Sequence, residues 1–169
     1  MEDSGLRKIK FNPKILTEYF GNKVREMSRS CKRFGTKASC PPYVENIEYY
    51  KILLPSYKFG ICFIEKFDID NIINWERLGR ESSLIIHKAI LNYRDKLILS
   101  GHYFSVGFTA GSCKNCEKCS FPCRFPDKSL IPIEAIGIDV VKLVRKIAKI
   151  SIKFPITKYF YRIGIIVYD

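Results

Sequence analysis

Hydrophobic positions along the chain change between the period of a strand and the period of a helix. Residues 58–67, KFGICFIEKF, form a nearly continuous apolar run with β-branched and aromatic side chains, which is typical of a buried strand. In residues 75–97, apolar side chains recur at three- and four-residue steps with charges between them, which predicts a long amphipathic helix ending before Gly101. Residues 102–109 and 159–168 are rich in strand-forming side chains and predict two further strands.

Shorter segments predict three more helices. Asn12 and Pro13 are typical of a helix start, with asparagine as the capping residue, and predict a helix that runs toward Met27 with an interruption after Phe20. Residues 47–54, followed by a proline, and residues 138–150 complete the set.

The order of these elements favours an α/β fold, in which helices cover a small sheet of about three strands. A chain of 169 residues suits one core better than two, so we expect a single domain over residues 1–169, with a cysteine-rich metal loop at residues 111–127. No apolar stretch approaches the roughly 20 residues that cross a bilayer. The polar N-terminal segment lacks the apolar centre of a signal peptide. We therefore expect a soluble, cytoplasmic protein without membrane contact.

Cysteines carry the clearest chemical signal in the chain. Thiols stay reduced in the cytosol, so seven cysteines predict metal or redox chemistry rather than disulfides. Four of them fall within eleven residues, in the order C-x2-C-x2-C-x3-C. They are Cys113, Cys116, Cys119 and Cys123. This spacing is that of bacterial-type [4Fe–4S] motifs, because closely spaced cysteines can turn their sulfurs toward one centre.

The fourth ligand of such a cluster has two candidate sources. In two-cluster ferredoxins the last cysteine of the run serves the other cluster and a proline follows it. Here Arg124 follows Cys123, and the chain has no second run. Either Cys123 completes a single cluster or a distant cysteine does, with Cys31 and Cys40 as the candidates. These two cysteines could also bind a second metal, act as a redox dithiol, or be structural.

Zinc is the main alternative metal. Structural zinc also takes four thiolates, although it usually uses two C-x2-C pairs separated by a dozen or more residues. Of the remaining candidates, Cys62 lies within a predicted strand and is expected in the core. His87, on the polar face of the long helix, and His102 offer no nucleophile–base pair.

The net charge of +12 raises affinity for polyanions or for an acidic protein partner. Basic residues flank the cysteine run, and they either stabilise a reduced cluster or are ordinary solvated side chains: Lys114, Lys118, Arg124 and Lys128. Others form a stripe on the last predicted helix and just beyond it: Lys142, Arg145, Lys146, Lys149 and Lys153. This stripe is either a solvated face or a phosphate-binding one. No nucleic-acid motif and no phosphate-binding glycine loop supports a nucleotide ligand.

Several motifs together resemble a prokaryotic family of predicted metal-binding proteins without an established function. They are the CPP element Cys40-Pro41-Pro42-Tyr43, the G-x-C-x2-C-x2-C segment from Gly111, Cys123-Arg124-Phe125-Pro126, and the E-A-x-G-I-D-V segment from Glu134. The resemblance covers most of the chain and implies metal binding. Family members often carry a cysteine pair before the CPP element, and here Ser28 replaces its first member while Cys31 remains. Glu134 and Asp139 either cap the following helix or orient the backbone of the cysteine loop.

These observations lead to three hypotheses. The first is a [4Fe–4S] protein for electron transfer or redox sensing, with a redox protein partner that meets its basic surface. The second is a zinc-stabilised module whose basic helix contacts nucleic acid. The third is an enzyme that uses a cluster with one open iron to bind substrate, which is favoured if Cys123 is not a ligand.

Overall fold

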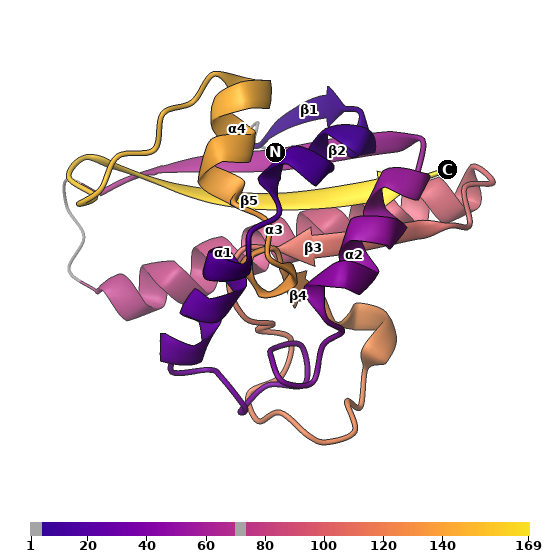
Figure 1. The fold of residues 1–169 in the computed structure, drawn as a ribbon. Helices are drawn as coiled ribbons and strands as arrows, with labels where there is room; N and C mark the ends of the chain where they lie inside the picture. The colour runs from indigo at the N-terminus through magenta and orange to yellow at the C-terminus, as the bar shows by residue number, and fades with distance from the viewer. Residues whose placement is uncertain (1–4, 70–73) are drawn as a thin grey trace.

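The protein has an α/β architecture, with helices on both faces of a twisted sheet (Figure 1). Within residues 5–69 and 74–169, which this computed structural model describes, the sheet has five strands in the order β1-β2-β5-β3-β4. Neighbouring strands run antiparallel, except that β3 and β4 are parallel. The predicted α/β class is confirmed, whereas the predicted sheet of about three strands is too small.

The three central strands are those that the sequence predicts. The strands are β1 (Arg7–Phe11), β2 (Phe59–Asp68), β3 (Ser105–Thr109), β4 (Ile131–Pro132) and β5 (Tyr159–Tyr168). The additional strands, β1 and β4, lie at the two edges. The side chains of β1 are exposed or half-buried, and β4 has two residues, so neither shows the apolar run that predicts a buried strand.

Helices occupy the predicted segments, with one change of type. They are η1 (Pro13–Tyr19), α1 (Asn22–Glu26), η2 (Met27–Ser30), α2 (Ile47–Leu53), η3 (Leu54–Ser56), α3 (Trp75–Leu99), η4 (Pro126–Lys128), η5 (Glu134–Ile136) and α4 (Val140–Ala148), where η marks a 3-10 helix. Asn12 caps η1 as predicted, accepting the N–H of Lys14 at 3.0 Å. The first helix is 3-10, and it ends because Phe20 turns to extended backbone and forms a β-bridge with Ile138.

Hydrophobic side chains alternate across the sheet and form a core on each face. On one face α3 covers β2, β3 and β5, with Ile86 and Ile90 buried against Phe63. On the other face η1, α2, η5 and α4 cover the sheet, and Cys62 is fully buried there, as predicted. Within the described residues no helix combines the length and the apolar character of a membrane span, and that includes the 25-residue α3.

Gly164 of β5 faces α3 at a point without room for a side chain. A Cβ atom there would lie 2.5 Å from Ile90 Cδ1 and 2.6 Å from Ile86 Cγ2. Gly164→Ala is therefore expected to lower the free energy of unfolding in urea by about 1–3 kcal/mol, the usual cost of overpacking a core. Gly79→Ala in α3 is the control, because its Cβ meets nothing nearer than 3.6 Å and alanine favours a helix. Equal unfolding free energies for the two variants would contradict this account of the packing.

Candidate metal centre

The cysteine-rich loop leaves the sheet at the end of β3 and returns to it at β4. These strands pair in parallel, with Phe108 opposite Ile131, so the two ends of the loop are held side by side. His87 of α3 holds the returning end, because its ring Nε2 lies 2.8 Å from the carbonyl oxygen of Lys128. His87 is 3% exposed, so the prediction that it lies on the polar face of the helix is wrong. Burial lowers the pKa of His87, which favours the neutral ring.

Four cysteine side chains of the loop line one small hollow. They are Cys113, Cys116, Cys119 and Cys123, all half-buried and all free thiols. The rest of the lining is Lys37, Ala38, Ser39, Asn115, Phe125 and Ser129, which adds neither a carboxylate nor an imidazole. The fold thus brings together the four residues that the cysteine spacing selects, in surroundings where thiols are the only side chains suited to a soft metal.

The segment before the CPP element forms the second wall of the hollow. The N–H of Ala38 donates to Cys119 Sγ at 3.4 Å, and the N–H of Cys113 donates to Ser39 Oγ at 3.4 Å. Beyond the prolines, the Tyr43 ring packs 4.6 Å from the ring of Phe121. Figure 1 shows the two loops side by side below the sheet, although about 80 residues separate them. Nothing in the sequence pattern predicts this contact.

Positive charge gathers beside the hollow around Lys114. This side chain is half-buried and donates to Ser112 Oγ at 3.1 Å. Desolvation lowers its pKa, and neighbouring cations lower it further: Arg33, Arg162, Lys37 and Arg80. Cations placed this close to one another repel, and an anion bound between them would relieve the repulsion. The site therefore favours thiolates, or another anion, over neutral occupants.

The hollow suits a thiolate-bound metal by its donor set, but the thiols are not arranged around a single ion. In residues 5–69 and 74–169, no three His, Cys, Asp or Glu side chains lie close enough to hold a metal ion together. One tetrahedral zinc ion would need sulfurs about 3.8 Å apart, because its Zn–S bonds are about 2.3 Å long. The volume of about 20 Å³ holds roughly one water molecule. A cluster of several iron and sulfide ions would therefore require the loop to open.

Cys31 and Cys40 line a different, larger cavity. Cys31 is exposed at the end of η2, and its Sγ accepts the N–H of Arg33 at 3.4 Å. Cys40 is 6% exposed. Burial raises the pKa of the Cys40 thiol, a hydrogen bond with Ser39 lowers it in part, and the charges of Cys31 and Cys113 raise it again. Cys40 therefore lies within electrostatic reach of both the exposed thiol and the hollow, without lining the latter.

Two acidic residues after the loop have separate roles. Asp139 caps α4 and accepts the N–H of Lys142 at 3.1 Å, as one prediction expects. Glu134, in η5, contacts the backbone of the cysteine loop, which is the other predicted role. The N–H of Gly111, at the start of the loop, stabilises its carboxylate. Burial raises the pKa of Glu134, and the nearby Arg162 offsets part of this rise. Sequence reasoning missed Arg162, although a single charge inside the apolar run of β5 was an available signal.

Comparison with known proteins supports metal binding at the level of the family. No curated protein and no solved structure matches the chain. A family described as predicted metal-binding protein (DUF2284) matches residues 17–167, which include the cysteine loop, both of its walls and the E-A-x-G-I-D-V segment. Because this match covers nearly the whole chain, the resemblance noted from the motifs is confirmed. The chain belongs to the DUF2284 family of predicted metal-binding proteins.

Proposed function

We propose that this protein binds a [4Fe–4S] cluster through Cys113, Cys116, Cys119 and Cys123 and serves in electron transfer or redox sensing. The observation that carries the proposal is that these four thiols line one hollow whose other side chains supply neither a carboxylate nor an imidazole. When bound, such a cluster supplies one-electron redox chemistry. The chain supplies the ligands and sets the charge around them.

Residues beside the hollow would adjust the reduction potential. The Ala38 N–H that donates to Cys119 Sγ withdraws charge from that sulfur, and the cations around Lys114 stabilise the more negative, reduced form. Both effects raise the potential. They come from the segment before the CPP element and from α3 as well as from the cysteine loop, so the potential depends on the packing of these parts against one another.

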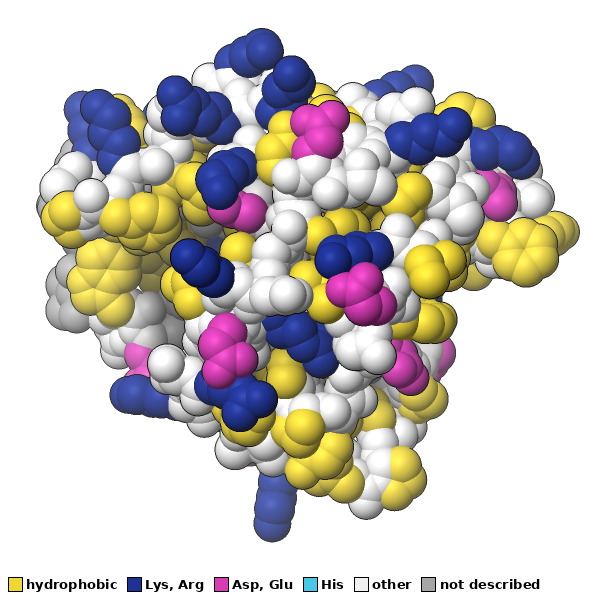
Figure 2. Space-filling view, in the orientation of Figure 1, with side chains coloured by type: hydrophobic (Ala, Val, Ile, Leu, Met, Phe, Trp, Pro, Cys, Tyr) yellow, Lys and Arg dark blue, Asp and Glu magenta, His cyan; other side chains and the backbone are white. Residues whose placement is uncertain are grey.

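A redox protein with an acidic surface is the partner that we propose. The net charge is +12, and Figure 2 shows Lys and Arg side chains gathered along the upper edge of the visible face, where Figure 1 places α4 and β1. Opposite charge would steer such a partner toward the protein at low ionic strength, and electron transfer would require it to dock at the cysteine loop, where the cations around Lys114 lie. Nucleic acid would respond to the same charge, but the chain has no motif that supports it.

The large cavity beside Cys40 favours one alternative, an enzyme that binds its substrate next to the cluster. In that case one iron would be open, and Cys123 would not be a ligand. The other alternative is a zinc-stabilised basic module. Metal analysis separates zinc from iron, and replacement of individual cysteines separates a closed cluster from an open one.

Metal analysis of protein purified without oxygen tests the proposal directly. We expect a brown protein with about four iron and about four acid-labile sulfide per chain, because a cubane contains both in equal number. Exposure to air should bleach the colour and release iron. A colourless protein with one zinc per chain would contradict the cluster and favour the zinc-stabilised module.

A further inference from the structure

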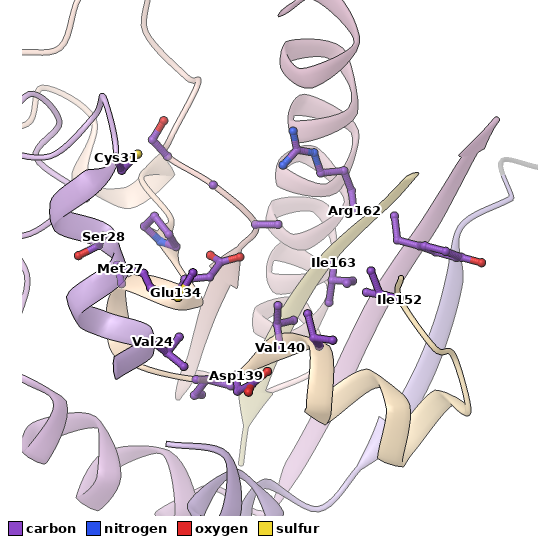
Figure 3. A pocket seen from close by; sticks show the side chains of 18 of the residues that line it. Val24, Met27, Ser28, Cys31, Glu134, Asp139, Val140, Ile152, Arg162 and Ile163 are labelled. Atoms are coloured by element: carbon purple, nitrogen blue, oxygen red, sulfur yellow. The ribbon is translucent and has the colours of Figure 1, made fainter. Parts of the chain in front are cut away.

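A cavity of about 550 Å³ lies between α1, η2, η5, α4 and the end of β5 that carries Arg162. Its volume is in the range of small-molecule sites, about 300–1,000 Å³. Figure 3 shows Val24 and Met27 pointing into it from one side and Ile152 and Ile163 from the other. Most of the lining is aliphatic or aromatic, so the main body of an occupant would be apolar.

Glu134 places an unsatisfied acceptor on the wall of this cavity. Its Oε2 is out of contact with solvent and has no hydrogen-bond partner among the described residues. A buried carboxylate oxygen without a partner is costly, and such atoms are rare in folded proteins. No water-sized group reaches Oε2 in this conformation, so an N–H or O–H group of a bound molecule could donate to it after the side chain turns toward the cavity. Glu134 thus gives the cavity a polar group that a bound molecule would satisfy.

Arg162 places positive charge at the same site. Its Nε donates to Ser82 Oγ at 3.0 Å and its Nη2 to the carbonyl oxygen of Gly79 at 3.1 Å, which fix the guanidinium. These bonds do not use Nη1, which lies against Gly111 on the cavity wall. The cations around Lys114 add to this field, and Glu134 is the acidic group that interacts with Arg162. Asp139 also lines the cavity, but it caps α4 and pairs with Lys142 at 3.0 Å. The balance of charge at this end of the cavity favours an anion.

We infer that the cavity binds a small organic anion. The ligand has an aromatic or aliphatic body, an acid group that meets Arg162, and an N–H or O–H group that donates to Glu134. The inference goes beyond the proposed cluster and does not rest on it, because the four cysteines of the loop do not line this cavity. Cys40, which does line it, is close enough to Cys113 for their charges to interact, so a bound molecule would lie beside the cysteine loop.

Two fluorescent probes with the same apolar body test the inference. The first, 8-anilinonaphthalene-1-sulfonate, carries an N–H donor and an acid group, whereas N-phenyl-1-naphthylamine keeps the donor but lacks the acid. Titrated into the full-length protein purified without oxygen, the anionic probe should bind at one saturable site about tenfold more tightly than the neutral one, the value of one charge-assisted hydrogen bond. Equal affinities, tighter binding of the neutral probe, or no saturable binding would overturn the inference.

A matched pair of tryptophan substitutions shows whether the probe occupies this cavity. Val24→Trp fills it from α1 and should weaken the anionic probe at least about tenfold. Ile52→Trp, at a position of α2 that is 79% exposed and outside the cavity, should leave the affinity unchanged. If circular dichroism shows that Val24→Trp does not fold, Val141→Trp fills the cavity from α4 instead. Unchanged probe binding in a folded, filled variant would overturn the assignment, whatever the metal content of the protein.

Discussion

Cys116→Ser is expected to release the iron of the proposed cluster, with a loss of at least about 100-fold in metal affinity. Disturbing a group that only supports a ligand costs 10–100-fold, and removing a ligand from a cluster costs no less. Cys116 is the second cysteine of the run and lines the hollow with the other three. Iron and sulfide per chain, together with visible absorbance after anaerobic reconstitution, measure the result.

Other cysteine variants provide the controls for this experiment. Cys62→Ala should keep its iron, because Cys62 is fully buried in the core away from the hollow. Cys123→Ser should lose iron as Cys116→Ser does, while Cys40→Ser should keep it, since Cys123 lines the hollow and Cys40 does not. The opposite result for these two would make Cys40 the fourth ligand. Retention of the full cluster in Cys116→Ser would exclude the proposed site.

Arg162→Met is expected to lower the free energy of unfolding at pH 7 by about 3 kcal/mol, because it leaves buried polar groups without their cation and donor. The substitution removes the donors to Ser82 and Gly79 and the positive charge that stabilises the Glu134 carboxylate. Urea denaturation measures the loss. Arg80→Met is the control, since Arg80 is exposed on α3 and its replacement should change the free energy by less than about 0.5 kcal/mol.

The destabilisation of Arg162→Met should depend on pH with a defined sign. Burial raises the pKa of Glu134 above its ordinary value of 4.5, and without Arg162 the pKa rises further. Between 4.5 and this raised pKa the folded state keeps a proton that the unfolded state releases, so stability falls as the pH rises through this window. Relative to the wild type, Arg162→Met should therefore lower the free energy of unfolding less below pH 4.5 than at pH 7. Adding Glu134→Gln to this variant should restore part of the lost free energy. Equal losses at both pH values would exclude an electrostatic role for Arg162.

Elements with a strong local pattern were predictable from the sequence. The long helix α3, the buried strands β2 and β5, and α4 show periods and caps that depend on neighbours within a few residues. The edge strands were not predictable from the sequence, because β1 takes its conformation from pairing with β2, and β4 takes its conformation from pairing with β3. The same holds for η1, whose end is set by the bridge from Phe20 to Ile138.

For the candidate site, the sequence by itself determined the chemical type: four thiols at short spacing, which the chain must bring close together because few residues lie between them. Only the tertiary structure decided what surrounds them. Ala38 meets Cys119, and Arg162 meets Ser82, across about 80 residues, through the packing of the sheet and its helices. Spacing along a chain restricts which groups are near each other over a few residues, whereas contacts at such separation depend on the whole core, so the second wall and the cavity could be found only in the fold.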